Sequence, residues 1–109
     1  MPEFITEAQV EQAIEYLRTS ASPAAQARAN RIYVEEYLKV VKAQIMKEHD
    51  GPISGQEREA LADPRYAAHL DAIREAVAID EKNRFLRSAA EARIEAWRTQ
   101  SSNERANRL

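Results

Sequence analysis

The C-terminal part of the chain contains no residue that would stop a helix. Residues 65–109 include neither Gly nor Pro and are rich in Ala, Glu and Arg, which lose little conformational entropy in a helix. The two glycines lie close together, at Gly51 and Gly55. Runs that alternate apolar and polar residues are absent, so we expect no strand. The pattern predicts an all-α protein whose long last helix follows one glycine-containing loop.

Two prolines mark predicted helix starts. Pro23 follows Ser22 and Pro64 follows Asp63, and both preceding residues are favoured N-caps. Proline is tolerated at the first position of a helix because its missing N–H would have no partner there. The sequence therefore predicts that one helix begins at Pro23 and another at Pro64.

Two capping boxes predict the remaining helix starts. Thr6 and Gln9 have the required spacing, as do Ser54 and Glu57, so that each side chain of a pair accepts a hydrogen bond from a backbone N–H near the other. The polar C-terminal end is expected to fray. Together these signals predict a single helical domain over residues 1–109, with helix one at 6–21, helix two at 23–48, a short helical turn at 55–62, the long last helix at 64–100 and a frayed tail at 101–109.

Apolar residues recur at helical spacing along each predicted helix. They predict a long antiparallel helical hairpin of helix two and the last helix, with the shorter N-terminal helix as a third packing element. The architecture expected is a three-helix bundle with coiled-coil-type packing. Tyr33, Tyr37 and Val40 form an aromatic ridge on helix two, which we expect to pack in the core. The other predicted core residues are Val10, Ile14, Leu17, Val34, Leu38, Val41, Ile45, Leu70, Ile73 and Val77.

The apolar face of the last helix changes direction along its length. A first stripe contains Tyr66, Leu70, Ile73 and Val77, and a second, offset by roughly 150°, contains Ile79, Leu86, Ala90, Ile94 and Trp97. Either the helix kinks near Asp80 or its two halves pack against different elements.

The last helix is also expected to outrun helix two by about ten residues, which leaves Ile94 and Trp97 without an obvious neighbour. Either helix one covers them, or a second chain does. The second alternative predicts a homo-oligomer, with a dimer as the default, whose interface contains Leu86, Ala90, Ile94 and Trp97.

The charge of the chain changes sign near residue 82. Residues 1–81 carry 9 basic and 15 acidic side chains, whereas residues 82–109 carry 7 basic and 3 acidic ones. Arginine binds phosphate through two hydrogen bonds, and Trp stacks on unpaired bases. The candidate contacts with single-stranded DNA or with an acidic protein surface are Arg84, Arg87, Arg93, Trp97, Arg98 and Arg105. The alternative is a solvated basic face that forms ion pairs with Glu91 and Glu95 at helical spacing.

The sequence offers little that supports catalysis. It contains no Cys, no phosphate-binding loop and no Glu-x-x-His pair of a bundle metal site. Glu48, His49 and Asp50 are adjacent, but at a helix end they are typical of carbonyl capping rather than of metal binding. We therefore expect no enzymatic activity, metal, cofactor or small-molecule substrate. No secretion signal and no membrane span are expected either, which favours a cytoplasmic protein.

Two segments carry a family resemblance. Residues 81–100, and the segment from Arg31 to Lys39, resemble small helical proteins encoded in bacteriophage recombination gene clusters, and the similarity extends over roughly residues 24–100. The resemblance implies an oligomeric accessory protein that helps a recombinase or annealing protein load onto single-stranded DNA in a bacterial host. Its functional residues would then be the Arg and Trp positions between Arg84 and Arg98. The alternative function is a structural or adaptor module that binds another protein and has no nucleic-acid affinity.

Overall fold

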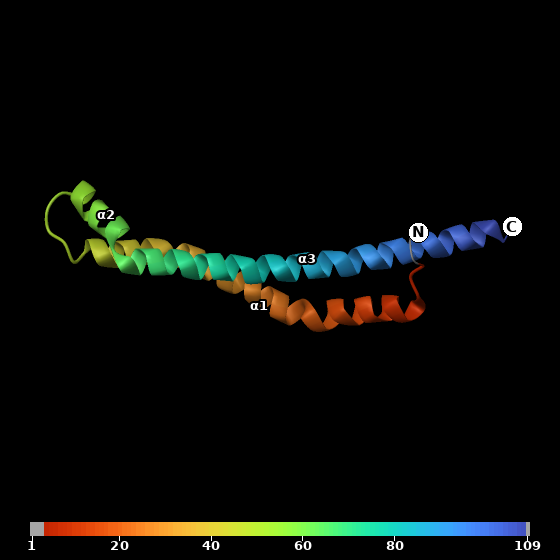
Figure 1. The fold of residues 1–109 in the computed structure, drawn as a ribbon. Helices are drawn as coiled ribbons and strands as arrows, with labels where there is room; N and C mark the ends of the chain where they lie inside the picture. The colour runs from red at the N-terminus through yellow and green to blue at the C-terminus, as the bar shows by residue number, and fades with distance from the viewer. Residues whose placement is uncertain (1–3, 109) are drawn as a thin grey trace. The chain divides into compact units, whose positions relative to one another are not determined.

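The prediction of an all-α protein is confirmed. The computed structural model describes residues 4–108, and over this range the chain forms three helices and no strand: α1 (Glu7–Met46), α2 (Ile53–Ala62) and α3 (Pro64–Asn107) (Figure 1). The long helices α1 and α3 form a helical hairpin, and the shorter α2 lies between them in the chain.

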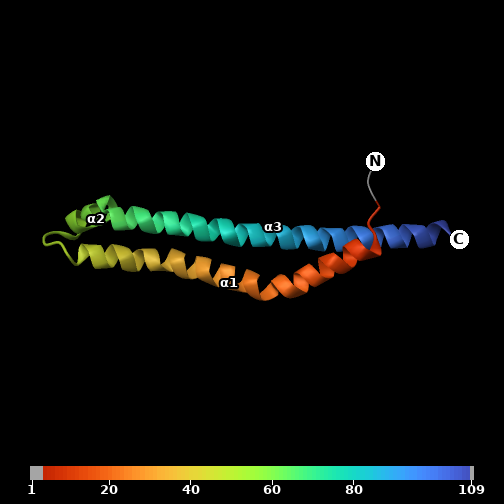
Figure 2. The same ribbon diagram turned by 60° about the horizontal axis from the view of Figure 1, so that its bottom comes forward.

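The chain divides into two compact units. Unit 1 comprises Met1–Ala25 and Lys82–Leu109, and unit 2 comprises Gln26–Glu81. Within each unit, one part of α1 runs alongside one part of α3 (Figure 2). Helix α3 remains helical through Asp80. Its two halves lie beside different parts of the same helix, α1, and not beside different elements as the second alternative predicted.

The predicted break before Pro23 is wrong. The chain remains helical from Glu7 to Met46, with Pro23 inside the helix. An interior proline removes one backbone hydrogen bond and disfavours a helix by about 3 kcal/mol. Arg87 of α3 holds the α1 segment before the proline through Ser20, and Asp80 holds the segment after it through Arg31. These tertiary contacts on both sides oppose the local tendency of the helix to end.

Three predicted caps have different outcomes. The Thr6–Gln9 capping box is confirmed, because the Thr6 N–H donates to Oε1 of Gln9 (3.0 Å) and the Gln9 N–H donates to Oγ1 of Thr6 (3.2 Å). The Asp63 cap of α3 is also formed, with the Arg65 N–H donating to Oδ1 of Asp63 (2.8 Å). The Ser54 capping box is wrong, since α2 already begins at Ile53 and its N-cap, Pro52, has no side chain able to accept a hydrogen bond.

The predicted frayed tail over residues 101–109 is also wrong over most of its length. Helix α3 continues to Asn107, and residue 109 lies outside the described residues. No Gly or Pro interrupts this segment, and Arg105 in the last turn complements the negative end of the helix dipole.

The core is narrower than predicted. Val10 and Ile45 are buried as expected, but Ile14 and Leu70 are exposed, and so are Tyr33 and Val40 of the predicted aromatic ridge. Two helices in contact cover only the strip of each helix that faces the other, so the aromatic ridge predicted for helix two remains partly in solvent. The other predicted core residues are half-buried: Leu17, Val34, Leu38, Val41, Ile73 and Val77.

Small and polar residues occupy much of the buried strip. Ala13, Ala60 and Ala76 are buried, which allows neighbouring backbones to approach closely. Asp80 is only 4 % exposed and accepts a hydrogen bond from Arg31 (3.1 Å). The same guanidinium also donates hydrogen bonds to Glu35 and Glu81. The hydrogen bond to Glu35 has the largest effect on the pKa of Arg31, and together with those to Asp80 and Glu81 it raises this pKa. This cluster fixes the register of α1 against α3 within unit 2.

A second ion-pair cluster joins the ends of α1 and α3 in unit 2. The Arg65 guanidinium donates to Glu48 (2.6 Å) and to Asp63 (2.9 Å). Hydrogen bonds from the side chain and the backbone of Arg65 lower the pKa of Asp63 to about 2. The carboxylate form of Asp63 is therefore favoured by the folded helix start.

Candidate interaction surface

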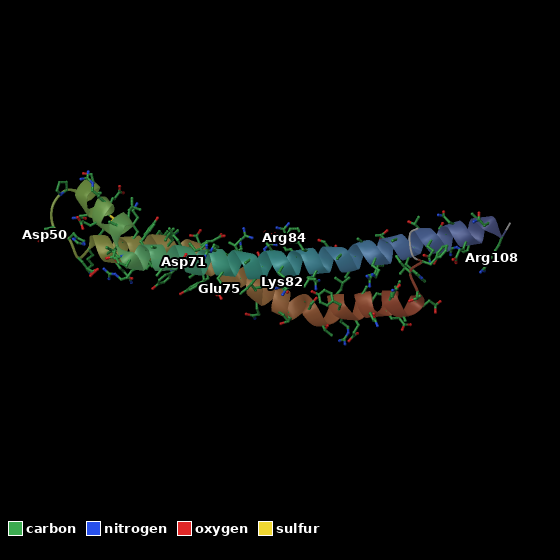
Figure 3. All side chains as sticks on the ribbon, in the orientation of Figure 1. Asp50, Asp71, Glu75, Lys82, Arg84 and Arg108 are labelled. Atoms are coloured by element: carbon green, nitrogen blue, oxygen red, sulfur yellow. The ribbon has the colours of Figure 1, made fainter. Side chains whose placement is uncertain are left out.

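All the residues predicted to contact nucleic acid or an acidic partner lie on α3 in unit 1. Figure 3 labels Lys82 and Arg84 near the middle of α3 and Arg108 at the C-terminal end of the chain, just after the helix. The structure brings the predicted set together on one helix, but it separates the members by burial. The exposed members are Arg84, Arg93, Arg98 and Arg105, whereas Arg87 and Trp97 are half-buried.

Arg87 faces α1 rather than solvent. Its Nη1 donates to the backbone carbonyl oxygen of Leu17 (2.9 Å) and to Oγ of Ser20 (2.6 Å). Ser20 is itself buried, and this bond satisfies its hydroxyl. The assignment of Arg87 to a free basic face is therefore corrected, because its guanidinium takes part in packing between the two helices of unit 1.

Arg98 forms the ion pair expected from helical spacing. Its Nη1 lies 2.8 Å from Oε1 of Glu95, one turn earlier on α3, and both side chains are largely exposed. An exposed pair of this kind contributes little to stability, but it places a negative charge beside the cation. The exposed face of α3 in unit 1 thus alternates in sign.

The acidic residues of α1 offset most of the basic charge of α3 in unit 1. Residues 82–109 have a net charge of +4, and residues 1–25 contribute one basic and four acidic side chains. Unit 1 as a whole therefore has a net charge of only +1. The charge asymmetry is strong along the sequence but weak within this folded unit, so its long-range attraction for a polyanion is small.

The four residues predicted to form an oligomer interface are unequally covered. Ile94, Trp97 and Ala90 are half-buried in unit 1, where α1 is the other helix. Leu86 is 47 % exposed. The predicted overhang of the last helix, which would leave Ile94 and Trp97 uncovered, is wrong. Helix α1 is longer than each of the two helices predicted for this part of the chain. In addition, Ile5, just before α1, forms a hydrogen bond with Gln100. Of the two alternatives for Ile94 and Trp97, partial cover within the chain is the one observed.

Gln100 anchors the segment that precedes α1. Its Oε1 accepts a hydrogen bond from the Ile5 N–H (2.9 Å), and its Nε2 donates to the Ile5 carbonyl oxygen (2.9 Å). A side-chain amide is suited to this because it offers one donor and one acceptor side by side. Sequence reasoning missed this contact, since nothing in the local pattern pairs residues so far apart in the chain.

A shallow groove of about 250 Å³ lies between the two helices of unit 1. The lining is mostly apolar and includes three alanines, with polar side chains at Gln12 and Arg93. Leu86, Ala90 and Arg93 were predicted as interaction residues. The contributions of Tyr16 and Ala89 were missed, because a groove wall depends on how two helices are rotated against each other. The full lining is Gln12, Ala13, Tyr16, Leu86, Ala89, Ala90 and Arg93.

The histidine-containing segments have structural partners. Nε2 of His69 lies 2.7 Å from the carbonyl oxygen of Val34, so Nε2 carries the proton, and the ring packs against Tyr37 with centroids 5.7 Å apart. Glu48 pairs with Arg65. Within residues 4–108, no group of three or more His, Cys, Asp or Glu side chains is arranged to hold a metal ion. Over the same range, none of the helices combines the length and the apolar character that crossing a membrane requires.

Comparison with protein-family models finds no match for this chain, and comparisons with curated proteins and with solved structures find none either.

Proposed function

We propose that this chain is a non-enzymatic helical adaptor that associates with copies of itself and binds another protein. The observation that carries the proposal is the amount of apolar side chain that its own helices leave uncovered. Among the described residues, five hydrophobic side chains are buried, and only Ile45 of these is large and fully enclosed. By contrast, exposed large hydrophobic residues occur on all three helices, including Ile32 on α1, Leu61 on α2 and Phe85 on α3.

The exposed side chains support self-association. Phe85 is 71 % exposed, Ile53 70 % and Tyr33 64 %. Exposed apolar side chains are typical of interaction sites, and removing them from water stabilises a complex.

The charge distribution favours a protein partner over a polyanion. Arg87 is used in packing, Arg98 is paired with Glu95, and unit 1 has a net charge of only +1. Nonspecific nucleic-acid binding depends on several uncompensated cations that release counterions together. An adaptor that presents mixed charge around apolar side chains does not need such a cluster.

Sedimentation equilibrium of the full chain tests the self-association. Measured over a roughly hundredfold range of protein concentration, the mass should be a multiple of 12.4 kDa and should fall towards 12.4 kDa only on dilution. A mass of 12.4 kDa at every concentration would reject the proposal.

A second candidate function is supported by the exposed arginines of α3. Arg93, Arg98 and Arg105 are exposed on the same helix, and the sequence resemblance implies a role in phage recombination. In this candidate the chain is an accessory protein in the cytoplasm of the bacterial host and contacts single-stranded DNA, or a recombinase, through these residues.

Binding of a fluorescently labelled oligothymidylate separates the two candidates. The nucleic-acid candidate predicts an increase in fluorescence anisotropy at low salt that weakens steeply as salt rises. The double variant Arg93→Glu and Arg105→Glu should abolish it. The matched control is Arg28→Glu with Arg74→Glu, which makes the same charge change at exposed positions of unit 2. The adaptor candidate predicts no binding at any salt concentration.

A further inference from the structure

The first part of α1, residues 7–22, is held to α3 by polar contacts at its two ends. This segment, called the N-terminal arm below, lies in unit 1. Just before it, the backbone of Ile5 forms two hydrogen bonds of 2.9 Å with the side chain of Gln100. Near its other end, Arg87 donates to Oγ of Ser20 (2.6 Å) and to a backbone carbonyl oxygen of the arm. The arm therefore runs antiparallel to α3 between two anchors (Figure 2).

Little apolar packing lies between the anchors. Within residues 7–22, all of which the structure describes, the buried hydrophobic side chains are Val10 and Ala13, and both are small. Ile94 and Trp97 occur between the two anchor residues of α3 and are only half-buried. The shallow groove of about 250 Å³ also lies between the arm and α3. Because segments with few buried apolar contacts open most readily, the arm is expected to have low local stability.

The part of α1 that belongs to unit 2 is held more firmly. Ile45 is 1 % exposed, and the guanidinium of Arg31 donates to the buried carboxylate of Asp80 (3.1 Å). Ala60 and Ala76 are also buried in this unit. Segments that differ in this way open separately in native proteins. We therefore expect the arm to lose its contacts with α3 at a lower cost in free energy than the rest of α1.

Pro23 marks the point at which the arm ends. It lies inside α1, and because proline has no N–H, the helix lacks one backbone hydrogen bond there. Proline is also tolerated at the first position of a helix, and Ser22 before it is a favoured N-cap. The residues after Pro23 therefore retain a good helix start when the arm separates. These local properties favour a hinge at this position.

We propose that the arm opens about Pro23 as a unit while unit 2 remains folded, and that this opening uncovers Ile94 and Trp97. Both anchors are formed in the closed state and broken in the open state. A partner that binds these two side chains would bind the open state and raise its population. The inference concerns contacts within one chain and does not depend on the proposed function.

Amide hydrogen exchange of the full chain, followed by NMR, tests whether the arm opens separately. Ile45→Ala weakens unit 2, which is folded in both the closed and the open state of the arm. Exchange of residues 34–44 should therefore become about 30-fold faster or more, whereas exchange of residues 11–22 should remain within about twofold. All samples are compared at one protein concentration. Equal acceleration of both segments would overturn the proposal, because the arm would then open only when the whole chain unfolds.

Ile45→Val makes the same comparison if Ile45→Ala does not fold. It removes one methyl group, so exchange of residues 34–44 should become about fivefold faster. Exchange of residues 11–22 should again remain within about twofold. Acceleration of the arm to the same extent as unit 2 would overturn the proposal here as well.

Three variants within unit 1 test the anchor and the hinge. Arg87→Ala should accelerate exchange of residues 11–22 by about 5–30-fold. Its matched control, Arg98→Ala, breaks an exposed ion pair with Glu95 on the same helix and should change this exchange by about twofold at most. Pro23→Ala restores the missing backbone hydrogen bond and should slow exchange of the arm by at least about tenfold. Exchange of the arm that is unchanged in Arg87→Ala or in Pro23→Ala would overturn the proposed opening.

Discussion

Ile45 allows a direct test of where the core of this chain lies. Its side chain is 1 % exposed, whereas that of Ile32, on the same helix and in the same unit, is 51 % exposed. The variants Ile45→Ala and Ile32→Ala remove the same carbon atoms from the same helix. Their effects on the free energy of unfolding should therefore differ only through burial.

The expected magnitude follows from the atoms removed. Each buried methylene contributes about 0.8 kcal/mol, so the Ile45→Ala change loses about 2.4 kcal/mol of transfer free energy. The higher helix propensity of alanine offsets about 0.4 kcal/mol of this loss, and a residual cavity increases the loss by up to about 2 kcal/mol. We expect a net loss of about 2–4 kcal/mol for Ile45→Ala. For Ile32→Ala, half the burial and no cavity predict a loss below about 1 kcal/mol.

Urea unfolding followed by far-UV circular dichroism measures both values. All samples are compared at one protein concentration, because association makes the apparent stability depend on concentration. With a denaturant slope of about 1–1.5 kcal/mol/M, the midpoint should fall by about 1.3–4 M for Ile45→Ala and by less than about 1 M for Ile32→Ala. Equal losses for the two variants would refute the placement of Ile45 inside and of Ile32 at the surface.

Three further predictions concern the caps and ion pairs. The pKa of Asp63 is lowered to about 2 in the folded chain, so its carboxylate stabilises the fold above about pH 4. This stabilisation should disappear as the pH falls from about 4 to about 2. In an acid titration of stability, the variant Asp63→Asn should lack this loss. Thr6→Ala removes a side-chain cap of α1 and should lower the unfolding free energy by about 1 kcal/mol in urea titrations; an unchanged midpoint would show that the cap does not contribute. Arg87→Ala deprives buried Ser20 of its hydrogen-bond donor and should lower the unfolding free energy by about 1–2 kcal/mol. Arg98→Ala breaks only an exposed ion pair and should lower it by less than about 0.5 kcal/mol. Comparable losses for the two variants would contradict the inward position of Arg87.

The caps were predictable because their signals are local. The Thr6–Gln9 box and the Asp63–Pro64 start involve residues three or fewer positions apart, and their hydrogen bonds form within one helical turn. Ser54 has the same spacing to Glu57, but α2 begins one residue earlier at Ile53. Pro52 and Gly51, with its positive φ of 100°, turn the chain just before that point, so the turn geometry rather than the box decides where the helix starts.

The candidate site was predictable only as a list of residues on one helix. Spacing correctly paired Glu95 with Arg98, because both lie on one face of α3. It assigned Arg87 to the same exposed face, since helical spacing contains no information about what lies opposite. The contact of Arg87 with Leu17 and Ser20 joins residues 70 and 67 positions apart, and only the packing of α1 against α3 creates it.

The sequence by itself determined that this chain is helical, where its loop lies, and how α1 and α3 begin, because these properties depend on backbone preferences and on side chains within one turn. The tertiary structure decided that α1 continues through Pro23, that alanines occupy much of the buried strip, and that Arg87 faces inwards. The physical reason is that local preferences between continuing and ending a helix differ by only a few kcal/mol. Contacts between residues distant in the chain are of the same size, and they settle choices that the local pattern leaves open.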